Sequence, residues 1–114
     1  MAIALRSWIR LTKLNHVLDK INQLNAVKYN WIYKENRSTK PQIGLIAQEL
    51  QAQYPELVDT DDNGYLSVNY GQFSAVLLEA VQEQQEIIKN QDAKLNDLNE
   101  KMKLLMEKVD KIKP

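Results

Sequence analysis

A ladder of regularly spaced side chains runs through the last third of this chain and limits what the chain can fold into. From residue 77 onward, apolar or amide side chains recur alternately three and four residues apart. They are Leu77, Val81, Gln84, Ile88, Gln91, Leu95, Leu98, Met102, Leu105, Val109 and Ile112. About five heptads of this kind exceed the three or four that indicate a coiled coil. We therefore predict a long helix whose apolar stripe, here called the heptad seam, is covered by further copies of the chain.

The length of this helix argues against a seam that is buried within one chain. A helix from Ser74 to Ile112 would extend roughly 58 Å at about 1.5 Å per residue. The residues that precede this helix are too few to bury an apolar stripe of that length. The alternative is a helix that lies along its own globular part. Leu78, Ala80 and Ile87 widen the apolar face, so we expect the first two turns to pack on that part. The flanking charges fix neither the orientation nor the number of helices.

Two positions of the seam carry amides instead of apolar side chains. Gln84 and Gln91 would be buried there, where an amide must find hydrogen-bond partners or lose its solvation free energy. In a symmetric bundle the amides of one layer bond to one another, which fixes register and oligomer number at some loss of stability. The alternative is that the seam is wet at these two layers.

Composition excludes several classes of function. Fifteen basic and fifteen acidic residues cancel in a chain of 114, which gives no electrostatic basis for binding nucleic acid or an anionic membrane. The chain has no Cys and one histidine, His16, so disulfides, thiol chemistry and the usual His/Cys metal sites are excluded, and we expect no cofactor. The apolar run Ala2 to Leu5 is too short for a signal peptide, and no segment approaches a membrane span. We expect a soluble chain without a targeting segment.

The periodicity of apolar residues predicts the elements that precede the ladder. One helical face collects Leu11, Leu14, Leu18, Ile21 and Leu24, and Ser7 is available as its N-cap. A strand period of two follows at Val27, Tyr29, Trp31 and Tyr33. Residues 43–54 fit either a helix or a short strand that leads into a helix ending before Pro55. Asn69 and Gln72 fit a capping box that opens the last helix.

The segment Asp59 to Gly64 has two interpretations. Asn63-Gly64 between two apolar runs predicts a hairpin turn, in which both residues would supply positive φ angles. The same six residues match the first half of a calcium loop, although its twelfth position is Tyr70 where a bidentate Glu is required. We favour the turn. Neither a phosphate loop nor a Ser-His-Asp set can be assembled from this sequence.

The order of several short segments resembles a known family. These segments are Val27-Lys28-Tyr29-Asn30-Trp31, Gly44-Leu45-Ile46-Ala47-Gln48-Glu49-Leu50, Pro55-Glu56-Leu57-Val58, Val68-Asn69-Tyr70 and Leu77-Leu78-Glu79-Ala80-Val81. From about Ser7 to Gln85 the chain is similar to the C-terminal intramolecular chaperone domain of phage endosialidases, tail spikes and tail fibres. A related domain occurs in the myelin regulatory factor family. The resemblance implies a trimeric domain that registers three chains, guides folding of an upstream fibrous passenger in the host cytoplasm during virion assembly, and is then released by self-cleavage.

The cleavage motif of that family is similar to Ser-Asp-x-Arg-x-Lys, in which Ser directly follows the cut and Lys is its base. The matching residues here are Ser7-Trp8-Ile9-Arg10-Leu11-Thr12. Trp8 replaces the Asp and Thr12 replaces the Lys, and a Thr side chain cannot act as the base. Lys13 follows directly but in a helix would be displaced by about 100° around the axis, so it could substitute only where the backbone is not helical. Ser7 and Lys13 are therefore the candidate catalytic residues, with a helix cap as the alternative role of Ser7.

The sequence thus predicts a mainly α fold with a small β element, forming a homotrimeric head with a C-terminal trimeric coiled-coil stalk. We expect the head at residues 7–73 and the stalk at 74–114, with residues 1–6 a remnant of the upstream passenger or an added leader. Because an active domain would have released Met1 to Arg6, we expect an uncut or impaired self-cleaving serine endopeptidase. The alternative is a permanent oligomerisation or adaptor module that never cleaves.

Overall fold

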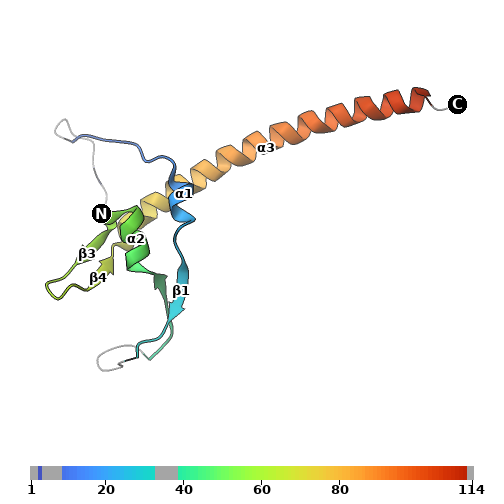
Figure 1. Ribbon diagram of the computed structural model, residues 1–114. Coiled ribbons are helices and arrows are strands. Elements are labelled where there is room, and N and C mark those ends of the chain that lie inside the picture. Colours follow the sequence, from blue (N-terminus) through green and yellow to red (C-terminus); the bar gives the residue numbers. More distant parts are fainter. Residues whose placement is uncertain (1–2, 4–8, 33–38, 113–114) are drawn as a thin grey trace. The chain divides into compact units, whose positions relative to one another are not determined.

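The computed structural model describes residue 3 and residues 9–32 and 39–112 (Figure 1). In chain order the elements are α1 (Val17–Ile21), β1 (Ala26–Tyr29), β2 (Gln42–Leu45), α2 (Ala47–Gln53), the 3₁₀ helix η1 (Pro55–Leu57), β3 (Val58–Thr60), β4 (Leu66–Val68) and α3 (Tyr70–Ile112). The fold is mainly helical with small strands, as predicted. The chain divides into two compact units, Met1–Ala80 and Val81–Pro114, which are described separately as the N-terminal and C-terminal units.

The first helix is much shorter than the sequence predicts. Helix α1 begins only at Val17, and residues 9–16 have no regular secondary structure. The physical reason is His16, whose φ of 53° and ψ of 36° lie in the left-handed region, which a right-handed helix cannot pass through. His16 holds the N-cap position of α1. Ser7, the expected N-cap, lies outside the described residues.

Strands β1 and β2 form an antiparallel pair whose register runs from Ala26 opposite Leu45 to Tyr29 opposite Gln42. The strand predicted from the alternation at 27–33 ends at Tyr29, and Tyr33 lies outside the described residues. Trp31 still packs edge-to-face on Tyr29, with ring centroids 5.5 Å apart. For residues 43–54, the structure confirms the second alternative, a strand that leads into a helix ending before Pro55.

The predicted hairpin is present, but its turn differs from the expected one. Strands β3 and β4 pair antiparallel, and Gly64 takes a φ of 85° while Asn63 keeps a negative φ. The amide of Gly64 donates to the carbonyl of Asp61 at 3.0 Å, and Oδ1 of Asp61 accepts from the amides of Asn63 and Tyr65 at 2.8 and 2.9 Å. Since Asp61 closes the loop with its side chain, only one residue with positive φ is required.

A small core holds the N-terminal unit together. Its buried apolar side chains are Val17, Leu50, Tyr54, Leu57, Phe73, Val76 and Ala80. Val17 and Leu50 are fully buried, which joins α1 to α2, and the last three of these residues bring the start of α3 into the same cluster. A core of this size is small for independent stability, because a short chain buries a low fraction of its apolar surface.

Helix α3 begins at Tyr70 with half of the predicted capping box, since the Asn69 side chain accepts a hydrogen bond from the Gln72 amide at 2.9 Å. The Asn69 amide donates to the Leu57 carbonyl at 2.8 Å instead of to the Gln72 side chain. Its first turns pack on the core, as expected. The packing face is formed by Phe73, Val76 and Ala80, whereas Leu78, which was expected to widen it, is 60% exposed.

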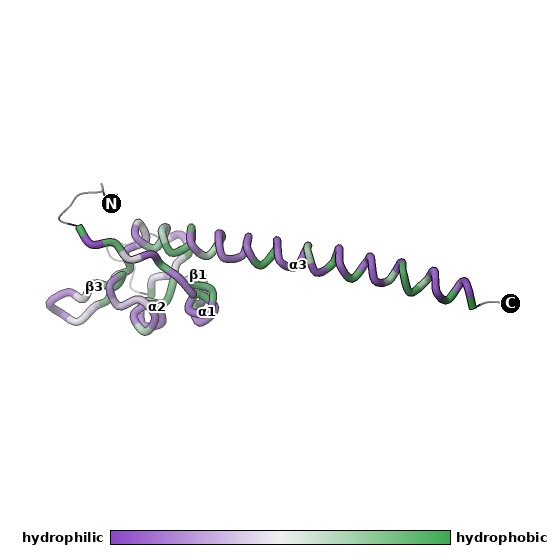
Figure 2. Tube along the Cα trace, turned by 90° about the horizontal axis from the view of Figure 1, so that it is seen from above, coloured by the Kyte–Doolittle hydropathy of each residue, from purple (hydrophilic) through white to green (hydrophobic). Residues whose placement is uncertain are grey.

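The C-terminal unit is the remainder of α3. Figure 2 shows hydrophobic residues recurring at intervals between hydrophilic ones along this helix. On its polar sides the helix carries exposed ion pairs such as Asp97 with Lys101, whose charged atoms are 3.0 Å apart. Each pair of this kind stabilises the helix by about 0.3–0.5 kcal/mol.

Candidate functional site

The residues of the predicted heptad seam are all exposed. The apolar members range from 46% exposed at Leu77 and Val109 to 81% at Ile112, and Gln84 and Gln91 are exposed as well. Large apolar side chains that recur on one stripe in this way indicate a surface that another molecule covers.

The middle of the seam also has the local shape that helix packing requires. Gln91, Lys94, Leu95 and Leu98 surround an open hollow of about 300 Å³. Their spacing of i, i+3, i+4 and i+7 is that of the four-residue hole into which a side chain of a facing helix inserts in a coiled coil. The residues around the hollow therefore have the spacing of one packing layer of such a bundle.

Within the N-terminal unit, core packing and the seam use different sides of α3. If Leu77 is a d position of the heptad, the buried residues Phe73, Val76 and Ala80 fall at g, c and g. Leu77 itself is 46% exposed although Val76, directly before it, is buried. Packing of the core thus leaves the a and d side of the helix open.

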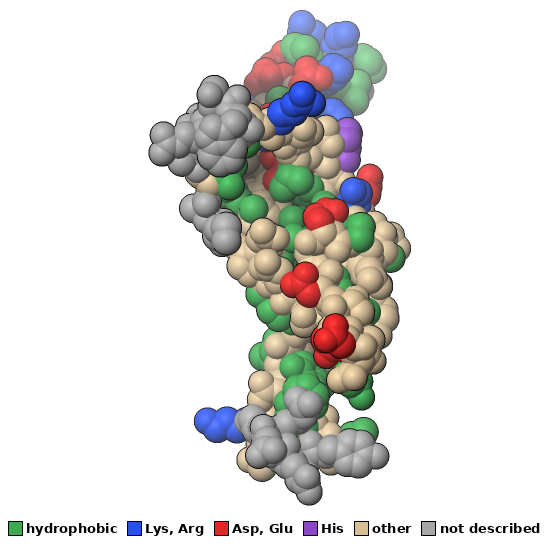
Figure 3. Space-filling model, turned by 90° about the vertical axis from the view of Figure 1, so that its left-hand side faces the viewer, with side chains coloured by type: hydrophobic (Ala, Val, Ile, Leu, Met, Phe, Trp, Pro, Cys, Tyr) green, Lys and Arg blue, Asp and Glu red, His purple; other side chains and the backbone are tan. Residues whose placement is uncertain are grey.

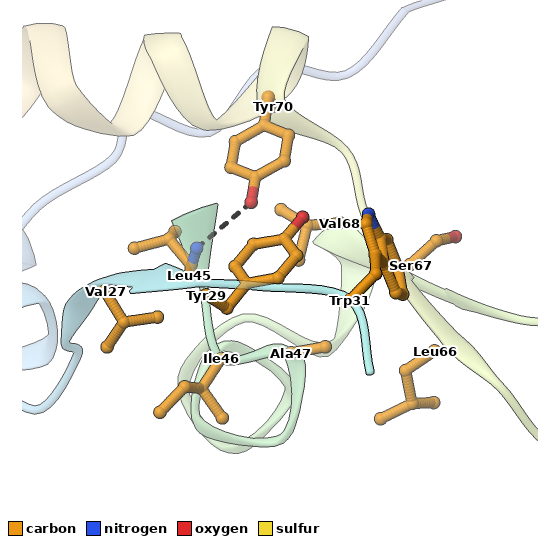
Figure 4. Close-up of a pocket in the computed structure, with 10 residues that line it drawn as sticks. All are labelled: Val27, Tyr29, Trp31, Leu45, Ile46, Ala47, Leu66, Ser67, Val68 and Tyr70. Carbon is orange, nitrogen blue, oxygen red and sulfur yellow. Dashed lines mark hydrogen bonds between the residues drawn. The ribbon is translucent and has the colours of Figure 1, made fainter. Parts of the chain in front are cut away.

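An apolar groove of about 390 Å³ lies between β1, the start of α2, β4 and the first residue of α3 (Figure 4). Its lining residues are Val27, Tyr29, Trp31, Leu45, Ile46, Ala47, Leu66, Ser67, Val68 and Tyr70. The lining has no acid–base pair. Tyr70 stands seven residues before Leu77, so the groove borders the side of α3 that carries the seam.

Lys13 makes a contact that sequence reasoning missed. Its Nζ lies 2.5 Å from Oε1 of Glu79 on α3, across 66 positions of sequence. The Lys13 side chain is 78% exposed, whereas that of Glu79 is only 11% exposed. A carboxylate so far removed from water needs a charged or hydrogen-bonding partner. The available signal was the single charge of Glu79 within the otherwise apolar run of residues 76–81.

The candidate catalytic pair is only half visible. Ser7 and Trp8 lie outside the described residues, so the structure places Lys13 but not the hydroxyl that it would serve. Thr12 and Lys13 lie in the segment without regular secondary structure. Because the backbone of this segment is not helical, the rotation of about 100° that a helix would place between Thr12 and Lys13 is absent here.

Several residues of the recognised segments have identifiable structural roles. Glu49 accepts hydrogen bonds from the backbone and side-chain nitrogens of Asn25 at 3.1 and 2.9 Å, which ties α2 to the start of β1. Gly44 lies against Tyr70, whose hydroxyl accepts a hydrogen bond from the Leu45 amide at 3.0 Å (Figure 4). Leu50 and Leu57 belong to the core. These segments thus position the hairpin of β1 and β2 against α2 and α3.

Comparison with known proteins covers the first three of the five segments that carry the resemblance. A family model described as chaperone of endosialidase matches residues 8–59, which include α1, β1, β2, α2 and η1. The chain contains a domain of this endosialidase chaperone family. The match leaves out Glu79 and the heptad seam, which lie beyond residue 59.

The relatives of this chaperone domain include phage fibre proteins. The chain is 31% identical over 80 residues to the long tail fiber protein Gp37 of Enterobacteria phage M1, and equally to that of phage Ox2. Each alignment covers 66% of this chain but 32% of the relative, so the chain spans about a third of the length of these proteins.

Among the residues that the structure describes, the other surfaces of the N-terminal unit show no second site. On the face in Figure 3, charged side chains of the N-terminal unit lie scattered between uncharged ones. Within the described ranges, no three His, Cys, Asp or Glu side chains are grouped so that they could hold a metal ion. Across those same residues, no helix combines the length and the apolar composition that crossing a membrane requires.

Proposed function

We propose that this chain is a homotrimeric assembly chaperone for an upstream fibrous tail protein of a phage. The observation that carries the proposal is the exposed heptad seam, together with the hollow at Gln91, Lys94, Leu95 and Leu98. A seam of this length on a chain of the endosialidase chaperone family fits a bundle of identical chains. The tail-fibre relatives favour a fibrous passenger.

The proposed mechanism is registration of three chains before the fibre folds. An intertwined fibre depends on contacts between distant or separate segments, which form slowly because chain entropy must be lost first. A bundle along the seam brings three chain ends together at a high effective concentration, and its layers fix their relative register. Gln84 and Gln91 would set that register through amide pairs within each layer.

The placement of the core supports this arrangement. Within the N-terminal unit the core packs on the g and c positions of α3, which leaves the a and d positions of that segment open to further copies of the chain. Small cores also favour association, since contact between copies buries apolar surface that one chain leaves exposed. Assembly would take place in the host cytoplasm before the virion is complete.

Release by self-cleavage before Ser7 is the second part of the proposal, and we propose that it is impaired in this chain. Ser7 would be the nucleophile and Lys13 the substitute for the base missing at Thr12. In the structure the Lys13 amine is paired with Glu79 instead. The alternative function, a permanent oligomerisation module, is favoured by the same observation together with Trp8 and Thr12.

The chaperone role can be tested on the natural full-length parent. The parent is expressed with the intact domain, without it, and with Leu95→Asp in the seam. We expect a soluble, protease-resistant fibre only with the intact domain. A passenger that reaches the same trimeric, resistant state without residues 1–114 would contradict the proposal.

The cleavage role can be tested separately by restoring the motif. Trp8→Asp combined with Thr12→Lys should place an amine within reach of the Ser7 hydroxyl and release the segment that precedes Ser7, as read by intact mass. Addition of Ser7→Ala should abolish release. If the restored chain stays uncut while remaining a folded trimer, the alternative of a permanent module is favoured.

A further inference from the structure

Glu79 is the one charged residue in the buried set of the described chain. It lies on α3 between Val76 and Ala80, which both belong to the core. Its carboxylate has a charged partner in Lys13, at 2.5 Å. Because a buried charge without a partner is strongly destabilising, this carboxylate favours any arrangement that keeps the Lys13 amine in contact.

The contact also fixes where Lys13 can be. The residues around it, 9–16, lack regular secondary structure, so backbone hydrogen bonds of a helix or strand do not hold them. An ion pair is formed by the protonated amine, whereas a base must offer a free lone pair. Pairing with Glu79 and acting as a base are therefore mutually exclusive states of Lys13.

We infer that Glu79 is an internal restraint that holds Lys13 and its segment in a resting arrangement. Two residues after the d position Leu77, Glu79 falls at f, on the side of α3 opposite the seam. Assembly through the seam consequently leaves the pair intact, and the restraint operates in the trimer as well as in one chain. Glu79 thus acts through Lys13 as a positioning residue; the link to cleavage rests on the proposed function, but the restraint itself does not.

The restraint can be measured through the reactivity of the Lys13 amine. The full-length chain and Glu79→Gln are treated with a limiting amount of an acetylating ester, and acetylation of each lysine is read by peptide mass spectrometry. We expect Glu79→Gln to raise the labelling of Lys13 by about two- to fivefold, the range appropriate to a pair whose amine is largely in solvent.

Lys101 is the matched control within the same sample, because it forms an ion pair with Asp97 in which both side chains are exposed. Its labelling should be unchanged by Glu79→Gln and nearly unchanged by Asp97→Asn. Equal labelling of Lys13 in the unmodified chain and in a folded Glu79→Gln variant overturns the inference.

A thermal double-mutant cycle gives a second measurement that does not depend on labelling. Lys13→Met removes the amine but keeps the aliphatic stem, and should lower Tm clearly because the Glu79 carboxylate is left buried without its partner. The same substitution in the Glu79→Gln background should lower Tm much less. Equal decreases in both backgrounds would show that the two side chains do not interact.

The consequence for cleavage separates this inference from the proposed function. Glu79→Gln should increase release of the segment before Ser7 by about two- to fivefold, the same factor as the labelling, because both reactions depend on the unpaired Lys13 amine. Lys13→Arg in that background should abolish release without lowering Tm, since a guanidinium remains charged. Raised labelling without any release leaves the restraint intact and contradicts the cleavage role of Ser7 and Lys13.

Discussion

The Tyr70 hydroxyl accepts a hydrogen bond from the backbone amide of Leu45 at 3.0 Å, which joins the first residue of α3 to the last residue of β2. This contact requires Gly44. A methyl group added to Gly44 would lie 2.6 Å from the Tyr70 hydroxyl oxygen and 3.4 Å from a ring carbon of Tyr29. The glycine is therefore needed for close approach.

We predict that Gly44→Ala lowers the free energy of unfolding by about 1–2 kcal/mol, because the methyl group displaces the Tyr70 hydroxyl. In a Tyr70→Phe background the same substitution should cost clearly less, since the nearest atom is gone. Chemical denaturation of the unmodified chain, the two single variants and the double variant measures the free energy of unfolding of each. A cost that is the same in both backgrounds would show that Tyr70 is not the obstacle.

His16 provides a test of where the first helix begins. In the left-handed region a residue with a Cβ is disfavoured by about 1–2 kcal/mol, so His16→Gly should be more stable than His16→Ala by about 1 kcal/mol. Inside a helix from Leu11 to Leu24 the order would be reversed, because Ala is the better helix former. Thermal denaturation of the two variants therefore distinguishes the structure from the helix predicted by periodicity.

Local signals were sufficient for part of the fold. Asn69 and Gly64 act over a few residues, and both the cap of α3 and the β3–β4 hairpin follow from them. The start of α1 could not be predicted in this way. The pattern at Leu11 and Leu14 is helical, yet the backbone of His16 and the distant contact of Lys13 with Glu79 set the conformation of this segment.

The candidate sites show the same limit. Heptad spacing alone located the exposed stripe on α3, because the a and d positions repeat within one helix. The partner of Lys13 was not predictable, since 66 residues separate it from Glu79 and only the folded core brings them together. The groove beside Tyr70 depends on the pairing of β1 with β2, and neither strand's sequence specifies its partner.

The amide layers of the seam predict a trade between stability and specificity. Gln84→Leu combined with Gln91→Leu should raise Tm, because two polar layers become apolar, while the distribution of oligomers broadens. Calorimetry together with sedimentation velocity reads both effects. If the variant stays a single trimer, the two glutamines do not specify oligomer number.

Calcium should not stabilise the chain. The Asp61 carboxylate already accepts two backbone hydrogen bonds in the turn, and Tyr70 stands where a calcium loop needs its bidentate Glu. We expect the same Tm with millimolar calcium and with a chelator. A saturable increase in Tm that disappears in Asp59→Ala would establish a calcium site.

The oligomeric state of the isolated chain tests the central claim most directly, by sedimentation equilibrium at micromolar concentration. Leu95→Asp and Leu104→Asp form a matched pair, since the two leucines are 55% and 57% exposed but only Leu95 belongs to the seam. We predict a trimer for the unmodified chain and for Leu104→Asp, and a monomer for Leu95→Asp. In a trimer of Leu95→Asp, the three carboxylates would be buried in one layer of the seam without a partner. An unmodified chain that sediments as a monomer, or a Leu95→Asp variant that remains trimeric, would contradict the account.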